Sequence, residues 1–308
     1  MSNTRRRNTL VFVMLIGLGL MAAPAVFQMF TRAPMGGDMI NDFRQYMTVE
    51  EVTKFEGYMS EIRLAEAESR EVLRAGLVES DVLTEAEYDT QFILVSGFSN
   101  SWPAIDEDMS DLVETMSQNV DNFADVDALP PFPLFPWFFV LPGLFVAVIA
   151  AMALRRSSDA EARPLAWALV GLGIAIVLAP AAFQMFTRAP SGAEMIDDFR
   201  PMMVEERVQA VQGYFVSIGG AEGQLRSSAV PLAVESGVGP LPAIDQLTSD
   251  WPTIVGEFAP MIGTMVDNVD NYEAVDALPN FSLFPWFFVV PGVLIALSAA
   301  QLVRSSKE

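Results

Sequence analysis

Four long apolar runs alternate with two long polar segments along the chain. Each run has the length that a helix needs to cross the hydrocarbon core of a bilayer, and none of them contains Asp, Glu, Lys or Arg. The pattern therefore predicts an all-α integral membrane protein with four transmembrane helices. The predicted membrane helices are 10–30, 134–154, 165–186 and 284–303.

The segments between and around these runs are of two kinds. Residues 31–133 and 187–283 are long and acidic, and we expect each to form an extracytoplasmic helical domain. The remaining segments are short: a tail at 1–9, a loop at 155–164 and a tail at 304–308. The predicted order is membrane helix, helical domain, membrane helix, written twice.

Apolar residues recur at three- and four-residue steps in both long segments, which is the spacing of one buried helix face. This face comprises Val49, Val52, Phe55, Met59, Ile62 and Ala65 early in the first segment, and Ile105, Met109, Leu112, Val113, Met116, Val120 and Phe123 late in it. The second segment repeats both stripes, for example at Val208, Val211, Phe215 and Ile218. We therefore expect an up-and-down helical bundle in each segment.

The middle of the two segments differs. Thr84 and Glu87 have the spacing of a capping box and predict a helix over 84–98. A last helix is expected to begin at Trp102-Pro103, because proline suits a first helical turn. In the second segment Gly237–Pro242 favours a loop instead, so that bundle is expected to be shorter.

The two halves of the chain repeat one another. The octet FQMFTRAP occurs at 27–34 and again, unchanged, at 183–190, and the matches continue at a spacing of 156 residues. From Trp102, which matches Trp251, the spacing falls to 149, so the second copy is shorter. Because each copy contains two membrane crossings, both enter the membrane in the same direction. The sequence thus predicts a parallel tandem repeat, related by an axis along the membrane normal, as in a fused homodimer.

Charge predicts the orientation. The net charge is −21, yet the short segments are net basic, with Arg5–Arg7, Arg155, Arg156 and Arg163 among their residues. Short loops rich in Lys and Arg mark the cytoplasmic side of a membrane. We therefore expect a cell-membrane protein with both termini in the cytoplasm and both acidic segments outside, in a prokaryotic envelope.

The first apolar run has one further interpretation. Three arginines precede it and it ends in Ala23-Pro24-Ala25, as in a cleavable signal peptide. The third run has the same ending at Ala179–Ala182 in mid-chain, where no such cleavage is expected. The repeat therefore favours a retained membrane anchor in both places.

The octet predicts an interface anchor at the outer end of the membrane helices. Aromatic rings prefer the headgroup level, and arginine just beyond it meets lipid phosphate or an acid of the outer domain. The predicted anchor residues are Phe27, Phe30, Arg32, Trp137, Phe183, Phe186, Arg188 and Trp286. Asp42 and Asp198 are the candidate ion-pair partners of the two arginines. Pro34 and Pro190 are expected to end the membrane helices.

Within the membrane helices, small residues predict close helix contacts. They are Gly17, Gly19 and Ala23 in the first copy, and Gly171, Gly173 and Ala175 in the second. No ionisable residue falls in mid-membrane, which argues against a proton- or ion-coupled pump.

The composition restricts the chemistry. The chain has no His and no Cys, which excludes the common metal sites, Ser-His-Asp triads, thiol nucleophiles and disulfides. No phosphate-binding glycine motif occurs, and an acidic exterior would repel nucleic acid. We therefore expect no enzymatic activity and no cofactor.

Carboxylates alone could bind calcium. The candidate ligands are Asp121, Asp125, Asp127, Asp270 and Asp276. Their spacing lacks the alternating acids, central glycine and terminal glutamate of an EF-hand loop. A solvated acidic surface is the preferred interpretation.

Three functions fit this architecture. The first is a non-enzymatic scaffold or accessory that binds membrane lipids or a partner envelope protein. The second is a sensor, because a helical domain between two membrane helices resembles the input half of bacterial chemoreceptors; that resemblance is architectural, and the cytoplasmic segments are too short for an output domain. The third is a transporter accessory with a lateral groove for an apolar compound. A lipid-handling function predicts an apolar groove at Phe27, Trp137 and their copies, whereas a sensor predicts a polar pocket in each bundle.

Overall fold

The computed structural model describes residues 3–305 and is helical, without a strand in that range. Residues 1–2 and 306–308, which belong to the two predicted cytoplasmic tails, lie outside the described residues. The chain forms two compact units and passes between them four times. Unit 1 comprises 1–41, 121–197 and 270–308, and unit 2 comprises 42–120 and 198–269.

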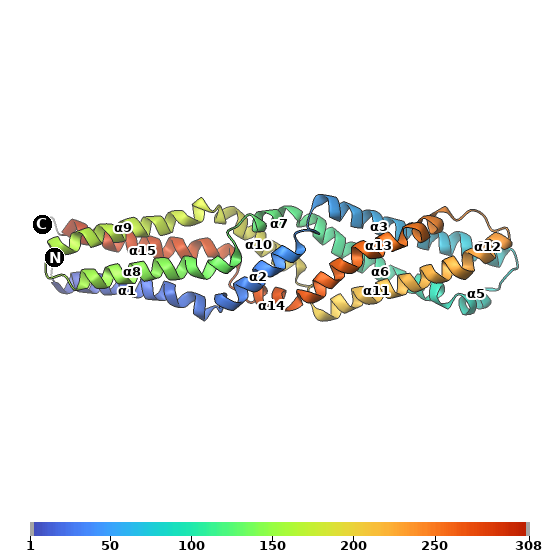
Figure 1. Ribbon diagram of the computed structural model, residues 1–308, viewed down its shortest axis with the longest axis horizontal. Helices are drawn as coiled ribbons and strands as arrows, with labels where there is room; N and C mark the ends of the chain where they lie inside the picture. Colours follow the sequence, from blue (N-terminus) through green and yellow to red (C-terminus); the bar gives the residue numbers. More distant parts are fainter. Residues whose placement is uncertain (1–2, 306–308) are drawn as a thin grey trace. The chain divides into compact units, whose positions relative to one another are not determined.

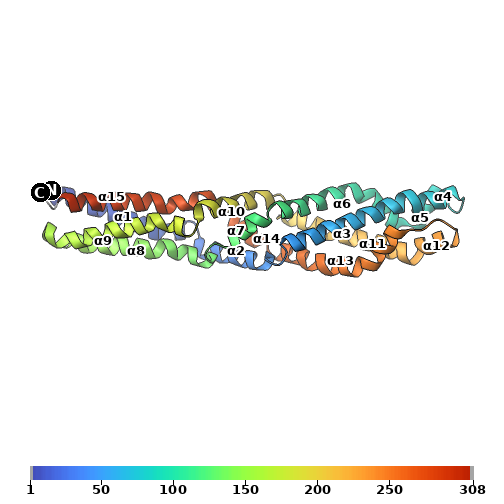
Figure 2. The same ribbon diagram turned by 90° about the horizontal axis from the view of Figure 1, so that it is seen from above.

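Four helices of unit 1 are long and apolar enough to cross a membrane, which confirms that prediction. They are α1 (Asn3–Val26), α8 (Phe135–Leu154), α9 (Asp159–Ala182) and α15 (Phe284–Ser305), and they run side by side in Figures 1 and 2. The helix α1 packs on α8 and α15, and α9 packs on α8 and α15. Large apolar side chains such as Leu15, Phe145 and Leu178 are exposed on them, a surface that lipid would cover.

Glycines make close contacts between the spans in each half of the chain. A Cβ on Gly17 of α1 would lie 2.7 Å from the carbonyl oxygen of Gly143, and a Cβ on Gly173 of α9 would lie 2.8 Å from that of Gly292. The backbones of α1 and α8, and of α9 and α15, therefore approach closely because these positions have no side chain. The small-residue prediction holds for Gly17 and Gly173, whereas Gly19 and Gly171 contact nothing within 4 Å of an added Cβ.

Short helices continue each span within unit 1. Most of α2 (Met29–Phe43) and α10 (Met185–Phe199) belongs to it, as do α7 (Val120–Asp127) and α14 (Val269–Asp276) apart from their first residues. Two 3-10 turns, η2 (Phe132–Leu134) and η4 (Phe281–Leu283), lead into α8 and α15.

Unit 2 is a bundle of four long helices drawn from both halves of the chain. They are α3 (Val49–Glu68), α6 (Ile93–Gln118), α11 (Glu205–Gln224) and α13 (Pro242–Asp267). Helix α3 packs on α6 and α13, and α11 packs on the same two helices. The sequence pattern predicts one bundle for each acidic segment, whereas the contacts combine helices of both segments in one bundle.

The centre of this bundle is aromatic. Phe258 of α13 is fully buried, and its ring centroid lies 4.7 Å from that of Phe55 on α3 and 4.8 Å from that of Phe215 on α11. The α3 stripe is buried as expected except for Val49, whose side chain is exposed. One phenylalanine therefore joins helices of both segments in a shared core.

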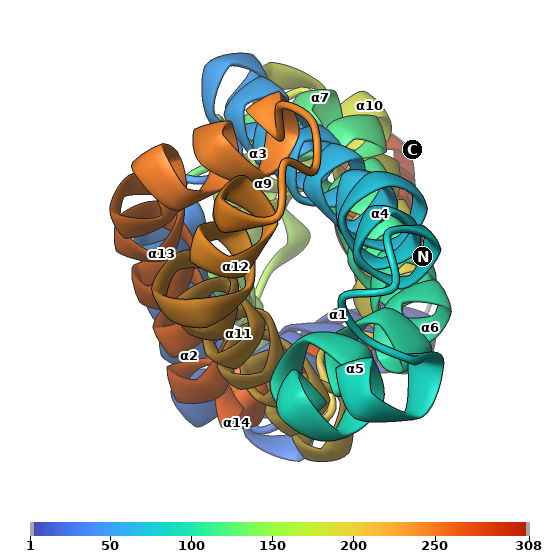
Figure 3. The ribbon, with the colours of Figure 1, turned by 90° about the vertical axis from the view of Figure 1, so that its right-hand side faces the viewer.

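Shorter helices complete unit 2 at the end that faces the viewer in Figure 3, where α5 and α12 are labelled. Helix α3 continues through a π-helical stretch, η1 (Ser69–Arg74), into α4 (Ala75–Glu79). Helix α11 does the same through η3 (Leu225–Ala229) into α12 (Val230–Glu235). The predicted Gly237–Pro242 loop is confirmed up to Leu241, and Gly237 has a positive φ of 72°.

The capping box is confirmed, but the helix that it opens is short. Thr84 Oγ1 accepts from the backbone of Glu87, whose side chain accepts from the backbone of Thr84, and α5 (Glu85–Gln91) follows. Phe92 then has φ −113° and ψ 52°, which interrupts the expected 84–98 helix. The prediction that a helix begins at Trp102-Pro103 is wrong, because α6 runs through both residues. Proline removes one helical hydrogen bond, and the buried stripe on α6 continues past it.

Candidate functional site

The repeated octet forms a break between two helices. Gln28 has a positive φ of 54°, between the end of α1 at Val26 and the start of α2 at Met29, and Gln184 has the same φ between α9 and α10. The Gln28 carbonyl accepts from the amides of Thr31 and Arg32, which starts the new helix. The left-handed glutamine therefore ends the membrane helix.

The prediction that proline ends these helices is wrong. Pro34 lies inside α2 and Pro190 lies inside α10. Each proline removes a single backbone donor, whereas the positive φ at Gln28 or Gln184 turns the chain out of the helix axis. Consequently Phe30 and Phe186, which were expected within the spans, belong to the following helices.

The predicted anchor aromatics meet in pairs. Phe30 and Trp137 make an edge-to-face contact with ring centroids 5.8 Å apart, and Phe186 and Trp286 make the same contact at 5.9 Å. All four side chains are also substantially exposed, between 44% and 52%. Each pair joins two elements of the same repeat and leaves ring surface free, as the predicted interface role requires. That role stays a prediction.

Other aromatic pairs join the two repeats. Phe27 stacks on Phe287 with centroids 6.2 Å apart, and the equivalent residues Phe183 and Phe138 stack at 5.6 Å. Three further pairs join positions that correspond in the two copies: Phe132 with Phe281, Phe135 with Phe284, and Phe139 with Phe288. Residues at and just before the start of α8 therefore contact the corresponding residues at the start of α15.

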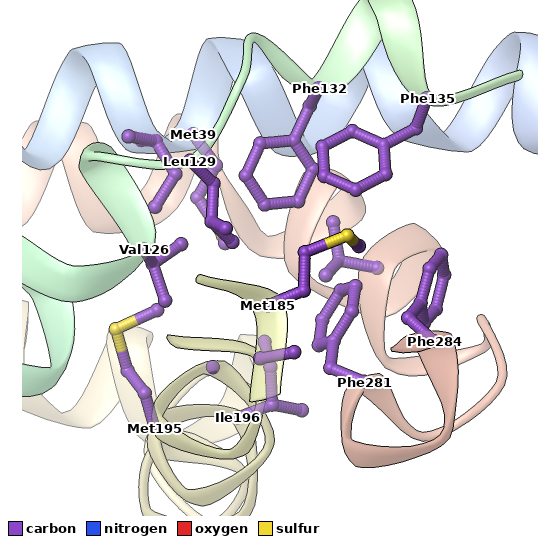
Figure 4. A pocket seen from close by; sticks show the side chains of 14 residues that line it. Met39, Val126, Leu129, Phe132, Phe135, Met185, Met195, Ile196, Phe281 and Phe284 are labelled. Atoms are coloured by element: carbon purple, nitrogen blue, oxygen red, sulfur yellow. The ribbon is translucent and has the colours of Figure 1, made fainter. Parts of the chain in front are cut away.

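Some of these rings form a dense apolar core. Figure 4 shows Phe132, Phe135, Phe281 and Phe284 around Met185, with Val126 and Met195 at the other side. The cavity among them measures about 20 Å³, roughly the space of one water molecule. Its lining is apolar, so this place is a packed centre of unit 1 rather than a ligand site.

The two arginines of the octet bind backbone carbonyls. Arg32 Nη1 donates to the carbonyl oxygen of Ala277 at 2.8 Å, and Arg188 Nη1 donates to that of Ala128 at 2.8 Å. Both acceptors directly follow short helices, α14 and α7, whose C-terminal ends attract positive charge. The arginines therefore connect the repeats at equivalent positions.

The acids proposed as partners of these arginines have other hydrogen bonds in unit 2. Asp198 Oδ2 accepts from Asn119 Nδ2 at 2.9 Å, and Asp42 Oδ2 accepts from Asn268 Nδ2 at 3.1 Å. The predicted ion pairs with Arg32 and Arg188 stay untested.

A much larger cavity lies between α1 and α15 in unit 1. It measures about 480 Å³, is partly open, and has no charged residue in its lining. From α1 it is lined by Ile16, Gly19, Leu20 and Ala23, and from α15 by Phe284, Trp286, Phe287, Val290 and Pro291. Phe27, Met29 and Pro279 line it as well, so it reaches the helix break that the octet forms. We call this cavity the α1–α15 groove.

Gly19 gives this groove part of its volume. A Cβ placed on Gly19 would meet no atom within 4 Å, whereas one on Gly17 would meet the backbone of α8. The two glycines are two residues apart on one helix and therefore face different neighbours. Because both residues are small, helix contacts were expected for both, although only Gly17 makes one.

The weak calcium candidates do not gather. Ser191 Oγ donates to Asp125 Oδ2 at 2.8 Å. Within residues 3–305 there is no group of three or more His, Cys, Asp or Glu side chains arranged to hold a metal ion. Asp121, Asp127, Asp270 and Asp276 therefore receive no assigned ligand role.

Comparison with known proteins gives no independent assignment. No protein-family model matches the chain, and no characterised protein matches it. The function must therefore be argued from the α1–α15 groove and the residues around it.

Proposed function

We propose that this chain is a non-enzymatic cell-membrane protein that binds a lipid in the α1–α15 groove. The observation that carries the proposal is the groove itself, an apolar cavity of about 480 Å³ between two candidate membrane spans. Its volume is within the usual range for small-molecule sites, roughly 300–1,000 Å³. Because it opens on helices whose exposed side chains are apolar, the occupant that fits it is an acyl chain.

The proposed topology places both termini in the cytoplasm and the acidic segments outside. Arginine supports it at one end of the spans: Arg6 is buried, and its Nη2 donates to the carbonyl oxygens of Ala153 and Arg156 at the end of α8. The basic short segments support it by the positive-inside rule. The groove then opens toward the outer leaflet.

We also propose that the chain is a parallel tandem repeat with the symmetry of a fused dimer. The support is a set of contacts at equivalent positions, including the Gly17–Gly143 and Gly173–Gly292 approaches and the two arginine–carbonyl bonds. The extracytoplasmic segments then form one shared bundle in unit 2, a surface for a partner envelope protein.

Filling the groove tests the lipid function. Gly19→Leu places a side chain in the open space beside Gly19, and Gly171→Leu makes the same change on α9 where an added Cβ also meets nothing. After purification in mild detergent, native mass spectrometry should detect a bound lipid on the wild type and on Gly171→Leu. The Gly19→Leu protein should retain at least about tenfold less, a loss of roughly 1.4 kcal/mol.

The control for folding is the melting temperature of each variant, which should not fall because leucine has a higher helix propensity than glycine. Equal lipid retention by all three folded proteins would contradict the proposed function. In that case the groove would not be a ligand site, although the packing of unit 1 would stand.

A further inference from the structure

We infer that the α1–α15 groove selects phospholipids with an anionic phosphate head group, and that Arg32 is the residue that recognises the phosphate. This inference rests on the proposed lipid function and adds the chemical class of the ligand. Arginine presents several N–H donors in a plane, which match two oxygens of a phosphate.

Arg32 does not line the groove itself, but it is close to two residues that do. It follows the lining residue Met29 by one helical turn of α2, and its hydrogen-bond acceptor Ala277 precedes the lining residue Pro279 by two positions. Arg32 as a residue is half-buried, and its guanidinium is held by the 2.8 Å bond from Nη1 to the Ala277 oxygen. An acyl chain in the groove would therefore bring its head group to this arginine.

Because the chain is acidic, binding of an anionic ligand requires a hydrogen-bond donor at the site itself. The chain carries a net charge of −21, so long-range electrostatics disfavour an anionic ligand. Asp276 adjoins Ala277 and adds a negative charge close to the site. Selection for phosphate must therefore come from directed hydrogen bonds by a fixed guanidinium.

The second repeat has larger residues at two positions that correspond to the groove lining. Arg188 makes the equivalent bond to Ala128, but Ala175 stands at the position equivalent to Gly19 and Leu141 at that equivalent to Val290. Both replacements add carbon atoms on the helices that correspond to α1 and α15. We therefore expect each chain to bind one phospholipid, on the Arg32 side.

The test compares two lipids that differ only in the head group. The full-length protein in nanodiscs is titrated with phosphatidylglycerol or with diacylglycerol of identical acyl chains, which lacks the phosphate, and bound lipid is counted by native mass spectrometry. We expect the wild type and Arg188→Gln to prefer phosphatidylglycerol by about tenfold, because a hydrogen bond to a charged group contributes roughly 1.5 kcal/mol. Arg32→Gln should bind both lipids equally.

Arg188→Gln is a matched control, since it loses the same kind of arginine–carbonyl bond as Arg32→Gln. Arg32→Lys keeps the charge and should retain part of the preference, which guards against a folding defect in Arg32→Gln. Added inorganic phosphate should not compete; competition would show that the site takes free phosphate and would overturn the lipid assignment.

The outcomes separate this inference from the proposed function. If Gly19→Leu loses both lipids while Arg32→Gln keeps the preference, only the role of Arg32 is overturned. Equal losses of preference in Arg32→Gln and Arg188→Gln would also overturn it. If Gly19→Leu retains both lipids, the groove function itself fails.

Discussion

Asn119 Nδ2 donates to Asp198 Oδ2 at 2.9 Å within unit 2, and the side chain of Asn119 is fully buried. The equivalent Asn268 is also fully buried and donates to Asp42 at 3.1 Å. Each asparagine additionally donates to the carbonyl oxygen four residues before it, at Thr115 or Thr264. Each amide thus stabilises the end of a long helix and ties it to the other half of the chain.

Loss of one of these amides should destabilise unit 2. Asn119→Ala leaves the half-buried Asp198 carboxylate without this donor, at a cost of about 1–3 kcal/mol. Asn268→Ala should cost a similar amount, whereas Ser117→Ala, on an exposed position of α6, should change little. Thermal unfolding followed by circular dichroism measures the difference; equal melting temperatures for Asn119→Ala and Ser117→Ala would contradict it.

Two glycines on α1 should respond differently to the same substitution. Gly17→Leu forces a side chain against the backbone of α8, where an added Cβ is already 2.7 Å from an oxygen, and should destabilise unit 1 by about 1–3 kcal/mol or more. Gly19→Leu enters open space and should leave the melting temperature unchanged or raise it. Unfolding in detergent followed by tryptophan fluorescence checks the order. A larger loss for Gly19→Leu would contradict the assignment of the two glycines.

A buried glutamate should make stability depend on pH. Glu66 of α3 is 5% exposed, and burial raises its pKa above the ordinary value, although Arg70 opposes this from 3.7 Å. A raised pKa in the folded protein means that folding favours the protonated acid. The contribution of protonated Glu66 to the free energy of unfolding is fully present below the unfolded pKa of about 4.3. It is lost as the pH rises through the folded pKa.

Glu66→Gln should therefore have a higher melting temperature than the wild type at pH 8, and the gain should vanish at pH 4. The equivalent Glu222 is a contrasting case, because Arg226 Nε donates to it at 2.9 Å. Glu222→Gln breaks that direct ion pair and should not raise the melting temperature at pH 8. A difference between Glu66→Gln and the wild type that is independent of pH would contradict the titration of Glu66.

Sequence patterns predicted the helices better than their partners. The apolar runs and the Phe55 and Met109 stripes specify spans and buried faces, because periodicity records local burial. They cannot state which helix covers Phe55, and the answer, Phe258 from the other half, depends on tertiary packing. The helix break at Gln28 was likewise assigned to Pro34, because a positive φ at glutamine has no sequence signature.

The candidate site was predicted in part. The octet and the tryptophans pointed to the outer end of the spans, and the groove reaches Phe27 and Trp286. The open space beside Gly19 could not be read from the sequence, since Gly17, two residues earlier, makes a close helix contact instead. Arg32 donates to a backbone carbonyl, and every residue has one, so the sequence could not identify Ala277 as the acceptor.

The orientation of the chain is open to a direct test, because the absence of cysteine makes single-cysteine labelling unambiguous. Ser60 on α3 and Ser157 between α8 and α9 are both exposed, so both should accept cysteine without loss of packing. Positive residues near Ser157, including Arg155 and Arg156, predict that it faces the cytoplasm. A membrane-impermeant maleimide should then label Ser60→Cys on intact cells and Ser157→Cys only after lysis. The reverse pattern would invert the protein in the membrane and place the α1–α15 groove in the inner leaflet, where a cytoplasmic partner rather than an envelope partner would have access to it.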